Sequence, residues 1–410
     1  MKTRFVIAAL CTVLALLLLA GCNSSKAEPA TADGGSTAAS TEEATQPPVP
    51  PTDYSEKIFY PAEVLENLKL YGRSAVIDKS VTCDWTASGI EFSADCKGDI
   101  YLDMTTTLDT YLTVYIDGIR IDELKYNHET KTRDGNTYYL DVGTHRVKIA
   151  SDLEAGLHTV RVLRQNMNGN TSVDAIVLSG EMRERPANRE MFIEFVGDST
   201  TCGYAALGIN KLLGLTTTDD KVGAATTEGT SAYAYLTAEA MQADYSMLAI
   251  SGIGFYKGSV SYPMTDVYPC ISYRRDHTQK DFQPTRTPDV VVVNLGENDE
   301  SRIKTNTAEF KAHVEGLIAQ IRTTYTESTP IVFCYNSTIQ CKIAPPLIQE
   351  VIDAKGGAEA GLYSLVMTTD ISPVTPDRHT HNGAPGNHPN VEQHKKQADT
   401  LTAFLREILK

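Results

Sequence analysis

The fold is decided by residues 191–204, which read MFIEFVGDSTTCGY. The first six residues are largely apolar and predict a buried strand, and Gly197 permits a tight turn directly after it. Ser199 therefore stands where a strand ends. A serine there can open the next helix as its N-cap, or it can present its hydroxyl to a substrate. On the Gly-Asp-Ser tripeptide alone, both interpretations are equally supported.

Strands and helices alternate from this segment to the C-terminus. We expect strands over 245–250, 289–295, 331–335 and 362–367, and helices over 231–243, 307–325, 347–354 and 391–409. Such alternation predicts a parallel sheet covered by helices on both faces, that is, a three-layer α/β/α domain over 187–410. Ligands of such sheets bind beyond the carboxyl ends of the strands, so the functional residues should lie there.

An all-β domain is expected over 54–186, ahead of the α/β domain. Residues 111–116 (YLTVYI) are β-branched and aromatic and stop at Asp117-Gly118, which is a hairpin signal. Further short strands are expected over 90–93, 137–140, 146–149, 158–163 and 172–178. Short strands at this spacing predict a β-sandwich of the jelly-roll kind. Its tryptophan is Trp85, and the domain is interpreted as a packing partner of the α/β domain, with glycan recognition as the alternative.

The first 53 residues are expected to lie outside both domains. Lys2 and Arg4 precede an apolar run that ends in Leu-Ala-Gly-Cys, so residues 1–22 predict a secretory signal peptide. The boundary resembles the bacterial lipobox, which implies lipidation of Cys22, export, and anchoring to the cell envelope. An uncleaved membrane helix is the alternative, for which the run is short. Residues 23–53 are rich in Ala, Ser, Thr, Glu and Pro and predict a disordered linker.

Charge and cysteine usage narrow the class of protein. The formal net charge is −15, which argues against nucleic acid as a partner because phosphate binding needs clustered basic residues. An acidic protein is not suited to an anionic membrane surface either, so we expect no membrane contact except through the lipid anchor. No glycine-rich phosphate loop follows a strand, so the sequence implies no nucleotide and no other cofactor. Cys83 with Cys96, and Cys334 with Cys341, are close enough to form disulfides, although buried free cysteines are the equal alternative.

Three further segments supply what a serine nucleophile needs. Residues 251–254 (SGIG) and 296–299 (GEND) each follow an expected strand. The Gly252 N–H and the Asn298 amide can donate hydrogen bonds to an oxyanion. Residues 386–389 (GNHP) precede the last helix, and His388 can take the proton of the serine hydroxyl. Taken singly, each segment is also ordinary loop sequence.

Together these motifs resemble the SGNH (GDSL) hydrolases, which have Gly-Asp-Ser, then a glycine, then Gly-x-Asn-Asp, then a late His-Pro. Residues 197–204 (GDSTTCGY), residues 230–233 (TSAY) and the preceding β-sandwich are similar to carbohydrate esterase family 2, the acetyl xylan esterase-like enzymes. The resemblance implies a flavodoxin-like hydrolase domain. It also implies a serine O-acetylesterase that deacetylates polysaccharide or oligosaccharide of the xylan or mannan type through an acyl-enzyme.

The same resemblance assigns roles to individual residues. It implies Ser199 as nucleophile, His388 as base, and the Ser199 N–H with Gly252 and Asn298 as oxyanion donors. Asp198 and Asp299 would support them, and no metal is implied.

One position departs from the family pattern. The aspartate that usually stands three residues before the histidine is replaced by Pro385. We expect a main-chain carbonyl within 385–387 to orient His388 instead, with Asp377 as the alternative. Other interpretations are an esterase acting on peptidoglycan, a host glycan or a lipid, and an inactive glycan-binding lipoprotein. A zinc site at His379, His381 and His388 is a further alternative that leaves the other motifs unused.

Overall fold

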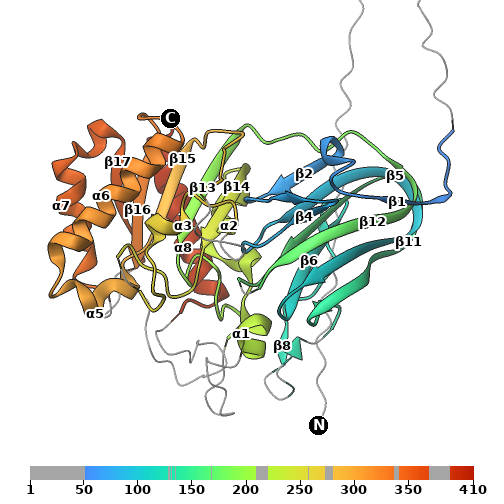
Figure 1. The fold of residues 1–410 in the computed structure, drawn as a ribbon, viewed down its shortest axis with the longest axis horizontal. Coiled ribbons are helices and arrows are strands. Elements are labelled where there is room, and N and C mark those ends of the chain that lie inside the picture. Colours follow the sequence, from blue (N-terminus) through green and yellow to red (C-terminus); the bar gives the residue numbers. More distant parts are fainter. Residues whose placement is uncertain are drawn as a thin grey trace, which may run out of the picture. The chain divides into compact units, whose positions relative to one another are not determined.

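The structure is a computed structural model that describes residues 51–410 except 128, 129, 131, 134, 168, 209–219, 257, 273–279, 337–340 and 369–387. The expected signal peptide at 1–22, the lipidation site Cys22 and almost all of the expected linker lie outside the described residues. Residues 51–410 form one unit by their internal contacts. Within it, an antiparallel β domain is followed by a parallel α/β domain, as the sequence predicts (Figure 1).

The β domain is built on one curled antiparallel sheet. Its main order is β10-β6-β11-β5-β12-β4-β3, and β1, β2 and β7 pair with β12, β5 and β6. The strands are β1 (Glu56–Phe59), β2 (Leu68–Tyr71), β3 (Val76–Ile77), β4 (Ser80–Thr82), β5 (Gly89–Thr106), β6 (Thr110–Ile116), β7 (Ile119–Arg120), β10 (Tyr138–Leu140), β11 (Gly143–Arg164) and β12 (Thr171–Met182). A small hairpin pairs β8 (Tyr126–Asn127) with β9 (Thr132–Arg133).

Two strands are much longer than the sequence predicts. The segments expected at 146–149 and 158–163 are two halves of β11, which pairs with β5 along most of its length. The residues between them read ASDLEAGL and lack a clear alternation of apolar and polar side chains, and the register shifts between Lys148 and Gly156. Bulges of this kind bend a strand without ending it. The long, curved β5 and β11 therefore join the two layers of the expected sandwich into one continuous sheet (Figure 1).

The α/β domain has a five-stranded parallel sheet of order β14-β13-β15-β16-β17. The strands are β13 (Met191–Gly197), β14 (Ala243–Ala249), β15 (Val290–Asn294), β16 (Ile331–Asn336) and β17 (Leu362–Thr368). The helices are α1 (Asp220–Thr226), α2 (Tyr233–Ala240), α3 (Met264–Val267), α5 (Glu300–Ile303), α6 (Thr307–Thr324), α7 (Ala344–Ala354) and α8 (Val391–Ile408). Short 3-10 turns form at η1 (Leu65–Asn67), η3 (Gly229–Ser231), η4 (Glu297–Asp299) and η5 (Gly357–Ala360).

Alternate residues of the central strands build two cores. Ile193 and Phe195 of β13 belong to a buried cluster with residues of α2 and α8. Val196 belongs to the opposite cluster, which contains Phe310 and other residues of α6 and α7. This alternation follows from the period of two along a strand. The result is the three-layer arrangement in Figure 1, with α6 and α7 on one side of the sheet and α2 and α8 on the other.

Helix α2 is shorter than the helix expected over 231–243. Residues 229–231 form the separate 3-10 turn η3. At the other end Gln242 has a φ of +52°, a left-handed conformation that stops a helix, and β14 begins at the next residue. The helix is therefore confined to Tyr233–Ala240. It follows η3 in the chain and precedes β14, the edge strand of the parallel sheet.

The β domain is bonded to the α/β domain through buried charged groups. Arg73 is 4% exposed and lies 2.9 Å from the carboxylate of Glu194, which is fully buried in β13. Tyr268 and Tyr325 also donate to this carboxylate. Trp85 is buried in the α/β core cluster and its indole N–H donates to the carbonyl of Ile271. Trp85 therefore packs across the seam and offers no exposed face to a sugar.

The cysteines behave as buried hydrophobes. All six cysteines after residue 51 are buried, and Cys83, Cys96 and Cys334 are free thiols. Neither disulfide considered from the sequence is formed.

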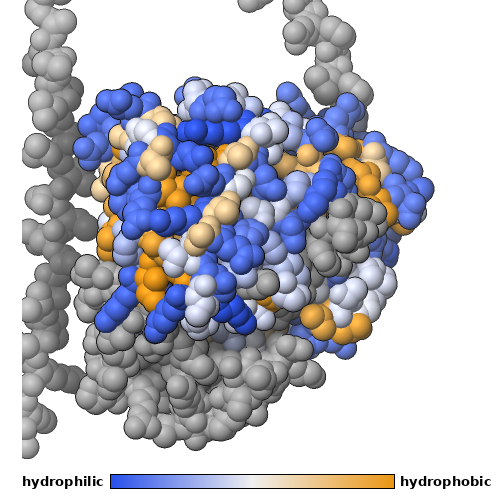
Figure 2. All heavy atoms as spheres, turned by 60° about the vertical axis from the view of Figure 1, so that its left-hand side comes forward, coloured by the Kyte–Doolittle hydropathy of each residue, from blue (hydrophilic) through white to orange (hydrophobic). Residues whose placement is uncertain are grey.

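The face in Figure 2 is dominated by polar residues, with hydrophobic ones in smaller groups among them. Within the described residues, no helix is long and apolar enough to span a membrane.

Candidate active site

Ser199 lies in a tight turn at the carboxyl end of β13. A Cβ at position 197 would lie 2.0 Å from the hydroxyl oxygen of Thr201, so only glycine fits there. The Cys202 N–H donates to the Asp198 carbonyl and the Tyr204 N–H to the Ser199 carbonyl, both at 3.0 Å. Residues 200–207 are turns rather than a helix, so Ser199 caps no helix. Its side chain is instead held at the strand end, where the sequence places a nucleophile.

His388 meets this serine from the other end of the domain. Its Nε2 lies 2.7 Å from the Ser199 Oγ. Helix α8 begins three residues later with a capping box between Asn390 and Gln393, which fixes the start of the helix and so the approach of His388. Burial lowers the pKa of His388 to about 4. The imidazole is therefore neutral at physiological pH and can accept the serine proton.

Tyr204 is a contact of His388 that the sequence reasoning did not assign. The two rings meet edge to face, with centroids 5.0 Å apart. Tyr204 is five residues after Ser199, in the same run of turns, so the segment that carries Ser199 also packs against His388. The only sequence signal was its place in GDSTTCGY.

Asn298 is joined to the residues beside Ser199 and Gly252. Its Nδ2 donates to the Oδ2 of Asp198 and to the carbonyl of Ile253, both at 3.0 Å. The Ile253 carbonyl determines the orientation of the amide, because a flipped Asn298 would set its oxygen against that carbonyl oxygen. Both amide hydrogens already have acceptors. An oxyanion must therefore share one of these hydrogens or displace one acceptor.

The backbone donors expected for an oxyanion are available. In the described part of the chain, the N–H groups of Ser199 and Gly252 donate no hydrogen bond. Gly252 has a φ of +81°, and a Cβ there would lie 3.0 Å from the Ser259 Cβ. Glycine is therefore required by conformation and by the close approach of the loop.

Asp299 supports the site through the backbone. It is fully buried, and its two oxygens accept from the N–H groups of Phe255 and Tyr256 at 2.9 Å. These bonds hold the loop that follows Gly252. A Cβ at Gly254 would lie 2.4 Å from the same carboxylate, which explains the second glycine of the SGIG segment.

The acidic groups around the site have raised pKa values. Burial raises the pKa of Asp198 well above its usual range, and the neighbouring Glu297 adds to the shift. Burial raises the pKa of Glu297 to about 7, with a smaller contribution from Glu300. Perturbed carboxyl groups beside a serine and a histidine are typical of functional sites. Glu297 was not singled out from the sequence, where it is one more acidic residue in a loop.

Several residues considered from the sequence lie outside the described residues. They are the proposed orienting groups at 385–387 and at Asp377, and the zinc alternative's His379 and His381. His394 is fully buried on α8, and its Nδ1 accepts from the Tyr233 N–H at 3.2 Å. It therefore joins α2 to α8. Among the described residues, no group of three His, Cys, Asp or Glu side chains could hold a metal ion.

Comparison with known proteins finds similarity to one family in less than half of the chain. Residues 193–365 match the family described as GDSL-like Lipase/Acylhydrolase. A cellulase/esterase of Acetivibrio thermocellus is 26% identical over 290 residues, covering 67% of this chain and 33% of that protein. An acetylxylan esterase / glucomannan deacetylase of Cellvibrio japonicus is 28% identical over 227 residues, covering 50% of this chain and 59% of that protein. The chain thus spans only part of both relatives.

Solved structures share the whole arrangement of two domains. A family two carbohydrate esterase from Clostridium thermocellum, in complex with cellohexaose, has a TM-score of 0.69 at 23% identity, covering 83% of this chain and 99% of that one. An acetyl xylan esterase from Butyrivibrio proteoclasticus has a TM-score of 0.67 at 18% identity, covering 84% and 96%. At these identities the likeness shows the fold. It covers the β domain as well as the hydrolase domain.

Proposed function

We propose that this GDSL/SGNH hydrolase, whose relatives include carbohydrate esterases of family 2, is a serine O-acetylesterase of polysaccharide or oligosaccharide. The observation that carries the proposal is the 2.7 Å contact between the Ser199 Oγ and the Nε2 of His388. A neutral imidazole at hydrogen-bond distance from a serine hydroxyl is the arrangement that activates a serine nucleophile.

The chemistry follows from the positions of these groups. The Ser199 Oγ attacks the acetyl carbonyl while its proton passes to the Nε2 of His388. The carbonyl oxygen becomes an oxyanion, for which the N–H groups of Ser199 and Gly252 and the Asn298 amide are the donors. The intermediate collapses when His388 returns the proton to the departing sugar hydroxyl, leaving acetyl-Ser199. Water, deprotonated by His388, then releases acetate and restores the serine.

The carbohydrate assignment is supported by the relatives and by the shared fold. One curated relative is named as an acetylxylan esterase and glucomannan deacetylase, and a structural neighbour was solved with cellohexaose. We assign xylan or mannan type polymers on this basis. Peptidoglycan, host glycan or lipid esters remain the alternative substrates for the same serine chemistry.

Acetate release tests the proposal. The protein should release acetate from 4-nitrophenyl acetate and from acetylated xylan or glucomannan, and Ser199→Ala should release none. Ser328→Ala, at an exposed serine, is the matched control and should keep full activity. A folded wild-type protein that releases acetate from no ester would overturn the proposal and favour the inactive glycan-binding interpretation.

We further propose that the protein is exported and anchored through a lipid on Cys22, on the strength of the sequence alone. Labelled palmitate should be incorporated into the wild-type protein in a bacterial host and not into Cys22→Ser. Incorporation that survives this substitution would contradict the assignment.

A further inference from the structure

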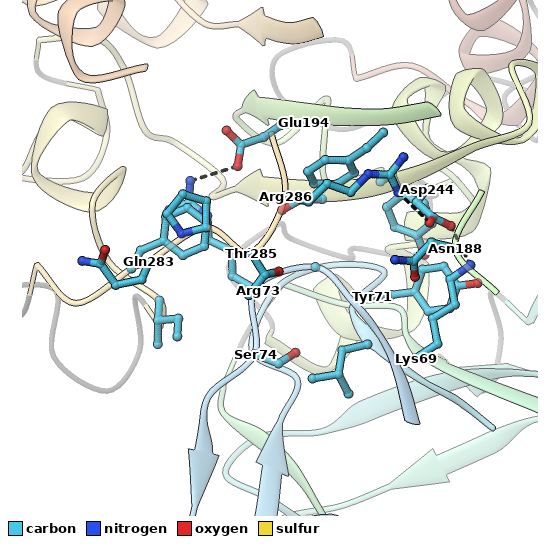
Figure 3. A pocket seen from close by; sticks show the side chains of 18 of the residues that line it. Lys69, Tyr71, Arg73, Ser74, Asn188, Glu194, Asp244, Gln283, Thr285 and Arg286 are labelled. Atoms are coloured by element: carbon cyan, nitrogen blue, oxygen red, sulfur yellow. Dashed lines mark hydrogen bonds and ion pairs between the residues drawn. The ribbon is translucent and has the colours of Figure 1, made fainter. Parts of the chain in front are cut away.

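A pocket lies away from Ser199, toward the amino ends of β13 and β14. Its volume is about 660 Å³, within the range of small-molecule sites. Phe192 and Glu194 of β13 line it, whereas Ser199 follows the opposite end of the same strand. Its other walls come from β2 with the turn after it, and from residues 282–286. Figure 3 shows these walls converging around Arg73, Glu194 and Asp244.

Polar groups at this pocket are left without hydrogen-bond partners. Among the described residues, the hydroxyls of Ser74 and Ser246 and the Nε of Arg73 are buried and have none. All three residues line the pocket. Buried polar groups in proteins are nearly always satisfied by protein, water or ligand. A ligand with hydroxyl groups can satisfy all three, because a hydroxyl both donates and accepts.

The pocket is also positively charged, in a protein whose formal net charge is −15. Four basic residues line it and only two acidic ones, an excess of two positive charges. Arg73 is paired with Glu194, and Lys69 and Arg286 share Asp244 (Figure 3). The remaining cation, Arg185, is solvent-exposed; it has no carboxylate partner among the described residues and donates to the exposed Asn188. An anionic group on the ligand would offset part of this excess of positive charge and could accept hydrogen bonds from Arg185.

We propose that this pocket binds a hydroxyl-rich ligand that carries a carboxylate, namely a uronic acid residue of an acidic polysaccharide. The choice of a sugar rests on the proposed function, while the carboxylate and the hydroxyl groups follow from the pocket itself. Small anions such as acetate and phosphate would leave most of the volume and the rings of Phe192 and Phe282 without contacts. The pocket would hold an acidic branch of the polymer at a distance from the serine.

Binding of two matched oligosaccharides tests this proposal. One is a xylo-oligosaccharide with a single glucuronic acid branch, and the other is the same compound with its carboxyl group reduced to a neutral hydroxymethyl group. Both are titrated into the full chain carrying Ser199→Ala, which prevents turnover. We expect the acidic compound to bind about tenfold more tightly, the effect of one charge-assisted hydrogen bond.

Two pocket variants and one control locate the effect. Arg185→Gln should remove the preference for the acidic compound, whereas Lys125→Gln, at an exposed cation outside the pocket, should retain it. Ser246→Ala, which changes no charge, should weaken both compounds about threefold. Equal affinities for the two compounds, or an equal loss for both in Arg185→Gln, would overturn the carboxylate assignment. Competition by millimolar acetate or phosphate would show a general anion site and overturn it as well.

Acetate release from 4-nitrophenyl acetate separates this proposal from the proposed function. Arg185→Gln should leave that activity unchanged, because Arg185 lies outside the serine site. An active enzyme without the binding preference refutes only the pocket proposal. An inactive protein that retains the preference refutes only the esterase.

Discussion

Asp198 should control catalysis through Asn298, and Asp198→Asn tests this. The Asp198 Oδ2 accepts from the Asn298 Nδ2 and its Oδ1 from the Thr200 N–H, both at 3.0 Å. An asparagine at 198 can still accept from the Thr200 N–H, but its own NH₂ group then faces the NH₂ group of Asn298. Two donors repel, so Asn298 must turn or move. The oxyanion donor is lost although the residue is still present.

The magnitude follows from what one oxyanion donor contributes. Removing such a donor costs about 10²–10³ in kcat. We expect Asp198→Asn to lower kcat by about 10² and to change KM little, because the donor acts on charge that develops in the transition state. Asn298→Ala should cost at least as much. The kinetics are measured with 4-nitrophenyl acetate, after a urea titration shows that each variant is folded.

The double variant decides between this reasoning and an independent role for Asp198. If Asp198 acts only by orienting Asn298, Asp198→Asn combined with Asn298→Ala should be no slower than Asn298→Ala alone. Losses that multiply, to about 10⁴ or more, would refute the orienting role. Full activity in Asp198→Asn would show that Asn298 does not depend on this carboxylate.

Four further predictions test the base and the domain seam. Burial lowers the pKa of His388 to about 4. We therefore expect kcat/KM to stay level from neutrality to about pH 5 and to halve near pH 4. A pH profile of kcat/KM with its midpoint near pH 6.5 would contradict this. The unfolded chain takes up this proton first, so His388 should also reduce stability as pH falls from about 6.5 to 4, measured by urea unfolding. Tyr204→Leu should lower kcat about tenfold by loosening the His388 ring, while Tyr204→Phe keeps the ring contact and most of the activity. Arg73→Met should cost about 3–5 kcal/mol in the free energy of unfolding because it leaves Glu194 buried without its cation, and adding Glu194→Gln should restore part of that loss.

The elements of the α/β domain could be predicted because their signals are local. Strand β15 is a run of valines, and helix α6 carries its apolar residues on one face; both were expected to within one residue. The long strand β11 could not be read in the same way. Its middle, from Ser151 to Gly156, mixes polar residues with Leu, Ala and Gly and is bulged, and it stays extended because it pairs with β5, a partner more than fifty residues away.

In the site, too, local sequence motifs could be predicted, whereas contacts between distant segments could not. The sequence pattern names Ser199 and His388, and the structure brings them together across 189 residues of chain. The pattern does not show that both Asn298 hydrogens are already used, because that depends on where Asp198 and the Ile253 carbonyl lie. Nor could spacing decide between disulfides and buried thiols, since Cys83 and Cys96 are near in sequence but remain free.

The β domain helps to hold the residues of the site in place. Two of its arginines, Arg120 and Arg133, lie 3.2 and 2.8 Å from the carboxylate of Glu228, which is fully buried. The Glu228 N–H donates to the carbonyl of Gly203, and a Cβ at Gly203 would lie 2.4 Å from the Glu228 carbonyl.

Glu228 therefore presses against the turn that carries Ser199 and Tyr204. The chain then continues through η3 into α2, where the Tyr233 N–H donates to His394 on α8, the helix that follows His388. The segments that carry Ser199 and His388 are thus both bonded to a segment that the β domain holds through Glu228. Because a buried carboxylate without its cations is costly, the hydrolase domain depends on these arginines for the geometry of its site.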